Sequence, residues 1–177
     1  ELVESFKVDT ALTNVRADST YGDTTGIFTA TLREATGTKK PVVGAVISFT
    51  LNGQAACGVS GKPACPTTNA QGVASFTGAV PAGINAGTYR NAVGASFEGA
   101  NFNVASQGGG PLVVARRILW VKASDRTVGL KQPNPPTTPP AGCVAQQTTT
   151  SACWLDLARS SVFVNGDDWA DLNLSVL

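Results

Sequence analysis

The sequence contains no histidine and no methionine, and only 14% of its 177 residues are charged. Without histidine the chain lacks the commonest general base, the commonest metal ligand and the side chain that titrates nearest neutral pH. Any catalysis would therefore rest on carboxylates, hydroxyls, lysines or cysteines. The net charge of +1 indicates neither a basic patch for nucleic acid nor an acidic tail. We expect no nucleic-acid partner.

Long apolar runs are also missing. No stretch approaches the roughly 18–20 residues that a membrane span needs, so we expect no span. The first ten residues, ELVESFKVDT, lack the basic and apolar regions of a signal peptide, so any such peptide would already have been removed. Hydrophobic residues make up 42% of the chain. That is enough to pack the core of one large β domain or two small ones.

Period-two alternation is the dominant pattern. It occurs in the stretches GIFTATLRE, AVISFTLN, GVASFTGAV and GPLVVA, which are separated by segments rich in turn-forming residues. No segment has the pattern of an amphipathic helix. Short strands at this spacing predict an all-β fold, and specifically an antiparallel β-sandwich. Within the turn Asn69–Gly72 (NAQG) we expect a tight hairpin, because glycine adopts positive φ at low cost.

The composition changes near residue 115. ARRILWVKASDRTV is typical of another strand, and five prolines follow between Pro133 and Pro140. Proline cannot donate to a strand ladder, so this stretch is not a central strand. Since β-compatible sequence lies on both sides, we interpret it as a long loop inside a second small β module.

The four cysteines fall into two close pairs, Cys57 with Cys65 and Cys143 with Cys153. Four cysteines allow three pairings. Local pairing is the simplest because each pair sits in its own polar loop. The gaps are longer than the usual spacing of zinc ligands. We therefore favour two disulfides over metal or free thiols, which implies an oxidising compartment and an extracellular or cell-surface location.

An ordered set of motifs resembles the bacterial immunoglobulin-like repeats of long surface proteins and adhesins. The motifs are STYGDTTGIFTATL, KKPVVGAVISFTLNG, TTNAQGVASF, INAGTYRNAVGASFEGANFNVAS and GPLVV, within residues 10–114. The resemblance implies an Ig-like sandwich there, preceded by an extension or strand at residues 1–9. Two departures stand out. The strand YRNAVGASF is about two residues long for the pattern, which predicts a bulge, and the loop between Cys57 and Cys65 is additional.

Residues 115–177 resemble more loosely the small MBG-type β modules of the same surface proteins, through VKASDRTV and FVNGDD. The module ends early relative to that pattern, so we expect it to be incomplete. Together the two resemblances imply a non-catalytic structural unit of a bacterial surface fibre, pilus-like filament or adhesin stalk. They imply no cofactor, and as partners either further copies of the chain or neighbouring modules.

Candidate chemical sites are few. Asp167, Asp168 and Asp171 form the densest acidic cluster, but they lack the spacing of a calcium loop, so we expect a solvated turn and no metal. Three other carboxylates that a hydrolase could use are scattered along the chain, and we expect no catalytic site; they are Glu34, Glu98 and Asp156.

The three tryptophans support an alternative function. Trp120, Trp154 and Trp169 all lie in the last third of the chain. If exposed and coplanar, they could stack on sugar rings, as in a carbohydrate-binding accessory module with polysaccharide as partner. Core or interface packing is the more common role of such residues.

The two ends of the chain suggest strand addition between molecules. Near the N-terminus, Leu2, Phe6 and Val8 are spaced for one face of a strand, ahead of the Ig-like pattern. The last six residues alternate in the same way, and their apolar positions include Leu172, Leu174 and Val176. A free strand at one end and an incomplete sheet at the other would allow head-to-tail assembly that runs on as a filament. The simpler alternative is that both ends are fragment boundaries.

Overall fold

The computed structural model describes residues 7–100, 102–118, 122–123 and 155–156. The chain divides into two units, Glu1–Arg116 and Arg117–Leu177. Regular secondary structure in the described ranges consists of β-strands, which confirms the all-β prediction. Within those ranges no helix is long and apolar enough to cross a membrane.

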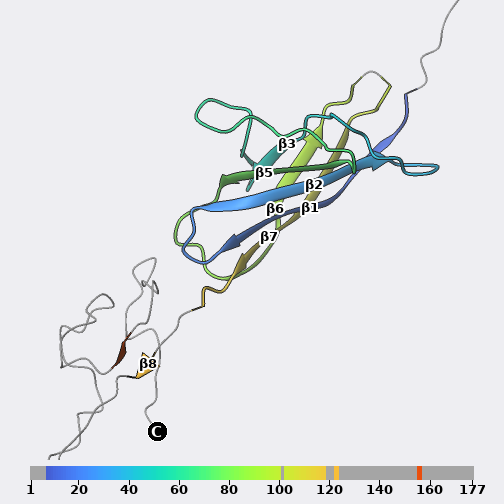
Figure 1. Ribbon diagram of the computed structural model, residues 1–177. Helices are drawn as coiled ribbons and strands as arrows, with labels where there is room; N and C mark the ends of the chain where they lie inside the picture. The colour runs from blue at the N-terminus through green and yellow to red at the C-terminus, as the bar shows by residue number, and fades with distance from the viewer. Residues whose placement is uncertain (1–6, 101, 119–121, 124–154, 157–177) are drawn as a thin grey trace, which may run out of the picture. The chain divides into compact units, whose positions relative to one another are not determined.

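Seven strands of the first unit form one hydrogen-bonded sheet (Figure 1). Its strand order is β4-β3-β6-β7-β1-β2-β5. The strands are β1 (Thr10–Thr20), β2 (Thr25–Glu34), β3 (Ser48–Leu51), β4 (Gln54–Ala55), β5 (Val73–Ala79), β6 (Gly87–Phe97) and β7 (Ser106–Ala115). Of the stretches of the first unit that were predicted as strands, AVISFTLN forms the shortest, because Val46 and Ile47 bond to the segment around Pro66 and Thr67 instead.

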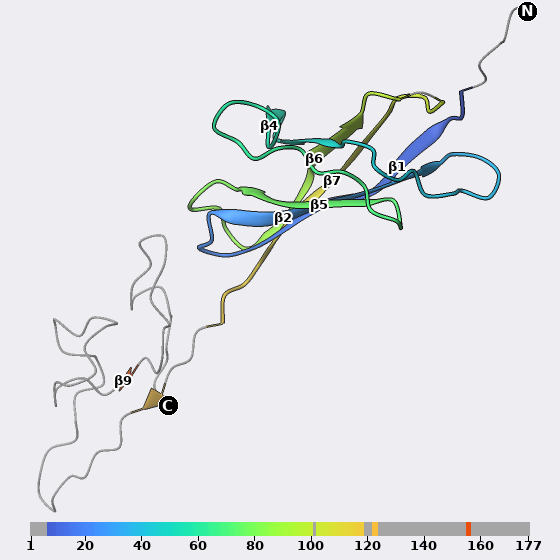
Figure 2. The ribbon, with the colours of Figure 1, turned by 45° about the horizontal axis from the view of Figure 1, so that its top comes forward.

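The sheet curls until its far strands meet across the core (Figure 2). Three phenylalanines show this closure. The ring of Phe49 on β3 lies 5.3 Å from that of Phe76 on β5 and 6.1 Å from that of Phe28 on β2. β3 is thus far from β2 and β5 in the strand order of the sheet, but their phenylalanine rings are neighbours in the core. The specific prediction of an antiparallel sandwich is not confirmed, because the seven strands form one mixed sheet that is curled into a half-barrel.

Strand β1 joins the two halves of this sheet. It pairs antiparallel with β2 on one side and parallel with β7 on the other. The β1–β7 pair therefore departs from the purely antiparallel pairing that the sequence suggested. Its ladder with β2 shifts register between Thr13 and Arg16, and Asn14 there has a φ of +51°. Asparagine tolerates this left-handed backbone, so it accommodates the bulge.

Alternation along the strands produces the core. Phe28, Ala30 and Leu32 of β2 are fully buried, while Ile27 between them and the turn is 54% exposed. Ile47, Phe49 and Leu51 are buried in the same way. These are the inward sets that period two predicted.

Two further sequence predictions concern local backbone. The ladder between β6 and β7 shifts register between Tyr89 and Val93, where Asn91 has a φ of +55°, so the predicted bulge is confirmed. The NAQG turn is also present, with a φ of +77° at Gly72. It is not a hairpin, however. The segment before the turn bonds to residues 44–47, whereas β5 after it bonds to β2.

The described part of the second unit is a two-residue antiparallel ladder. It joins β8 (Lys122–Ala123) to β9 (Leu155–Asp156), with Lys122 opposite Asp156 and Ala123 opposite Leu155. The two strands lie in the sequence on either side of the proline-rich stretch.

Candidate functional site: the terminal strands and the sheet edges

The first and last strands of the first unit run side by side in the same direction. Four residue pairs define their register, from Ala17 with Leu112 to Thr20 with Ala115. Just beyond the ladder, the backbone N–H of Tyr21 donates to the carbonyl of Ala115 at 2.8 Å. The first and last strands of the unit are therefore bonded directly to each other.

The parallel arrangement separates the two connections. At one end of the unit, the Thr10 hydroxyl donates to Ser106 Oγ at 2.9 Å, so the starts of β1 and β7 lie together. At the other end, Thr20 and Ala115 lie together. Since both strands run the same way, the chain enters at one end and leaves at the opposite end. A strand of about ten residues spans roughly 33 Å.

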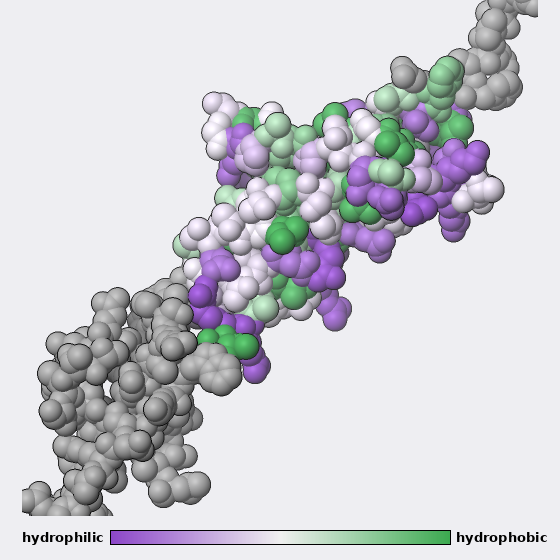
Figure 3. All heavy atoms as spheres, viewed as in Figure 1, coloured by the Kyte–Doolittle hydropathy of each residue, from purple (hydrophilic) through white to green (hydrophobic). Residues whose placement is uncertain are grey.

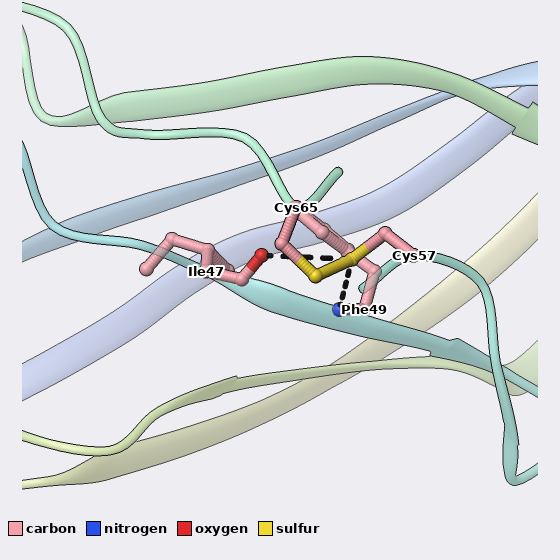
Figure 4. Close-up of a disulfide and its surroundings, with 4 residues drawn as sticks. All are labelled: Ile47, Phe49, Cys57 and Cys65. Atoms are coloured by element: carbon pink, nitrogen blue, oxygen red, sulfur yellow. Dashed lines mark hydrogen bonds between the residues drawn. A yellow bond between two sulfur atoms is a disulfide. The ribbon is translucent and has the colours of Figure 1, made fainter. Parts of the chain in front are cut away.

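A disulfide joins Cys57 to Cys65, as the sequence predicted (Figure 4). Cys57 is buried beside β3, where its Sγ accepts a hydrogen bond from the Phe49 N–H at 3.4 Å. The Ile47 carbonyl oxygen lies 3.9 Å from the same sulfur. Because a disulfide sulfur carries no hydrogen, this second approach is a contact and not a hydrogen bond. The second predicted bridge, Cys143–Cys153, lies outside the described residues.

The disulfide loop covers the outer edge of β3. The N–H of Ala56, next to Cys57, donates to the Phe49 carbonyl at 2.8 Å. The carbonyl of Pro66, next to Cys65, accepts from the Ile47 N–H at 3.0 Å. On this side, β3 (Ser48–Leu51) is therefore bonded to β4 and to the residues around Cys57, and Ile47 just before it is bonded to the other arm of the loop. The backbone groups of Ile47 and Phe49 that face the loop are not available to an additional strand.

The residues proposed for strand addition fall mostly outside the described ranges. These are Leu2, Phe6, Leu172, Leu174 and Val176. Val8 is described, and it is 36% exposed. Its N–H donates to the Phe102 carbonyl at 2.6 Å, and its carbonyl accepts from the Val104 N–H at 2.9 Å. Val8 is therefore bonded within its own chain, and only residues before it would be available to another molecule.

The other candidate residues contribute no site in the described ranges. Trp120, Trp154 and Trp169 lie outside them, as do Asp167, Asp168 and Asp171. Glu34 and Glu98 are described but belong to separate segments. Among the residues that the structure describes, no group of three or more acidic or cysteine side chains could hold a metal ion.

A surface hollow of about 420 Å³ lies near the point where the chain leaves the unit. Its lining mixes carboxylate, hydroxyl and apolar groups, including Asp18, Asp23, Thr77 and Val113. On the face drawn in Figure 3, hydrophobic residues are scattered among polar ones and form no broad patch. The edges of the sheet are therefore better candidates for a binding site than the face drawn in Figure 3.

Comparisons with protein-family models, with curated proteins and with solved structures found no match. The arrangement of the strands is thus the main source of functional inference. Sequence reasoning located β2, β3, β5, β6 and β7 but predicted neither β1 nor β4, and it missed the parallel β1–β7 pair and the covering of β3. Both depend on contacts between segments far apart in the chain, for which alternation gives no signal.

Proposed function

We propose that this chain is a non-catalytic, extracellular structural unit that carries load along a bacterial surface fibre, pilus-like filament or adhesin stalk. The observation that supports the proposal is the parallel pairing of the first and last strands of the first unit. Units whose connections lie at opposite ends can be joined end to end in a line. Tension applied to the chain then pulls the two paired strands along their length.

Loading in this direction strains the ladder hydrogen bonds together. Strands pulled along their length must break several bonds in one step, whereas strands peeled apart break them singly. The disulfide supports the extracellular part of the proposal, because such bonds persist in oxidising compartments. The alternative of a carbohydrate-binding module rests on tryptophans outside the described residues.

Substitution of Ala115 by proline tests the load-bearing role. In a parallel ladder of this register, the Ala115 N–H faces the Ser19 carbonyl, and the Ala115 side chain is exposed. Ala115→Pro removes that donor without removing core packing. We expect the free energy of unfolding to fall by about 1–3 kcal/mol. In single-molecule pulling between the chain ends, the first unit should unfold at a clearly lower force.

Ala115→Val is the matched control, because it keeps the N–H and is a good strand former. It should retain the parent's unfolding force. If Ala115→Pro unfolds at the same force as Ala115→Val while its equilibrium stability is reduced, the β1–β7 ladder does not resist the load and the proposal is wrong.

A further inference from the structure

The outer edge of β5 pairs with no other strand among the residues that the structure describes. β5 lies last in the strand order and pairs only with β2. Two hydrogen bonds, one beyond each end of the β2–β5 ladder, show which residues of β5 bond to β2. The Leu32 N–H donates to the Gly72 carbonyl, and the Val80 N–H donates to the Thr24 carbonyl. The even-numbered residues of β5 therefore bond to β2. The backbone groups of the odd-numbered residues face outward.

The free stretch of this edge runs from Ser75 to Ala79. Before it, Val73 is already satisfied: its N–H donates to Asn69 Oδ1 at 3.0 Å, and its carbonyl accepts from the Asn69 N–H at 2.9 Å. Ser75, Thr77 and Ala79 are exposed, and as odd-numbered residues they direct their backbone N–H and C=O groups away from β2. Each of the three presents one donor and one acceptor.

Other edges of the same sheet carry features that block pairing. The edge strand at the other end, β4, is only two residues long, and the disulfide loop bonds to the β3 backbone beside it. The part of β6 that extends beyond β3 holds the charged Arg90 and the bulge at Asn91. By contrast, β5 (VASFTGA) has no charge and no proline, and its register with β2 is unbroken over seven pairs. A straight, uncharged edge of this length is a template for another strand.

We propose that β5 pairs antiparallel with β5 of a second copy of this chain, about a two-fold axis at Thr77. In this register Thr77 lies opposite Thr77 of the second copy, and Ser75 lies opposite Ala79. The outward groups of one copy then meet the outward groups of the other. Each of the three pairs exchanges two hydrogen bonds, and the seven-stranded sheets become continuous.

The inward-facing residues of β5 do not obstruct this register. Phe76 lies opposite Gly78 of the second copy, and that position adds no side chain of its own. Each Gly78 is already covered within its own chain, because an added Cβ there would lie 2.9 Å from ring atoms of both Phe28 and Phe76. Electrostatics also permit the contact. Asp18 and Asp23 line the hollow that Thr77 also lines, and Asp18 is neutralised by an ion pair with Arg16.

The proposed interface is small, since it consists of one strand pair. Contacts of this size are weak between isolated molecules. Copies joined end to end, as in the proposed fibre, would present many such edges in a row, and linkage would raise the effective concentration of each. This lateral contact differs from head-to-tail joining, because a two-fold interface closes at the dimer.

Sedimentation equilibrium of the full chain tests the proposal with two substitutions at one position. The Thr77 N–H faces outward, so Thr77→Pro removes an interface donor from each copy but no bond to β2. We expect it to raise the dimer dissociation constant about tenfold or more. Thr77→Val keeps the N–H and should dimerise like the parent. Circular dichroism checks that both variants fold.

Cross-linking tests the register. Paired residues at a two-fold axis have Cα atoms about 5.5 Å apart, within reach of a disulfide. Thr77→Cys should therefore form covalent dimers on mild oxidation beyond any that the parent forms. Ser75→Cys should not, because its counterpart in the second copy is displaced by four residues, about 13 Å. The proposal is overturned if the parent stays monomeric at all concentrations, if Thr77→Pro dimerises like Thr77→Val, or if Ser75→Cys cross-links as readily as Thr77→Cys.

Discussion

At Gly72, two independent constraints exclude a side chain. The backbone φ is +77°, a conformation that residues with a Cβ rarely adopt. An added Cβ would also overlap the Leu32 carbonyl oxygen and lie 3.1 Å from Pro41 Cβ. The turn needs this conformation so that the chain can leave residues 66–68 and begin β5 beside β2. Gly72 thus determines the start of the strand whose edge is proposed to pair between molecules.

Gly72→Ala should lower the free energy of unfolding of the first unit by more than the cost of placing alanine at a positive φ. Gly83 is the matched control, since its φ is +73° but no atom lies within 4 Å of an added Cβ. We expect Gly83→Ala to cost about 1–2 kcal/mol in the free energy of unfolding. Gly72→Ala should cost about 3 kcal/mol or more, because steric overlap adds to strain. Urea unfolding measures both, and equal costs would contradict the role assigned to the Leu32 contact.

At the scale of elements, the disulfide loop covers one side of β3 and of the residue before it. Cys57 and Cys65 lie eight residues apart; Ala56, next to Cys57, bonds to Phe49 of β3, and Pro66, next to Cys65, bonds to Ile47. A flexible loop would leave that edge open part of the time. The bridge restricts the loop and so keeps the outward groups of β3 satisfied.

Replacement of both cysteines by alanine should therefore have two effects. The free energy of unfolding should fall by about 2–3 kcal/mol, because the unfolded chain is no longer restricted by a short closed loop. The rate of hydrogen exchange at the Ile47 and Phe49 amides should increase by a larger factor than the rate at the Leu32 amide. Reduction of the parent chain is the independent control and should reproduce both changes. Unchanged exchange at β3 would show that the loop covers the edge without the bridge.

At the scale of the whole molecule, two directions of assembly follow from the topology. Head-to-tail joining uses the ends of the chain, whereas lateral pairing uses β5. Val8 limits the first of these, because its backbone is already bonded to Phe102 and Val104. Any segment donated to another molecule must come from residues 1–6.

Deletion of residues 1–6 is the corresponding test. We expect the shortened chain to lose end-to-end filament growth, as seen by light scattering and negative-stain microscopy, because the donated strand is missing. Its folding should be unchanged, since Val8 keeps its internal bonds. Thr77→Pro in the full chain should still grow filaments, but with fewer lateral contacts. If the intact chain forms no filaments, or the shortened chain forms them equally well, strand donation by this segment is wrong.

The sequence by itself determined the local features of this protein. Alternation in GIFTATLRE predicted both β2 and its inward residues, because side chains of a strand point to opposite faces in turn. The glycine of NAQG predicted a turn, and two cysteines in one loop predicted their bridge. Each of these depends on residues close together in the chain, so the pattern contains the information.

Only the tertiary structure decided which strands are neighbours. The parallel β1–β7 pair joins residues 95 positions apart, such as Ala17 and Leu112. Which edge is covered and which is open depends on where the disulfide loop and the NAQG turn direct the chain. Strand sequences are compatible with many partners, since the backbone groups that form the ladder are the same in every residue but proline. The choice among partners is made by packing of the whole core, as in the meeting of Phe28, Phe49 and Phe76.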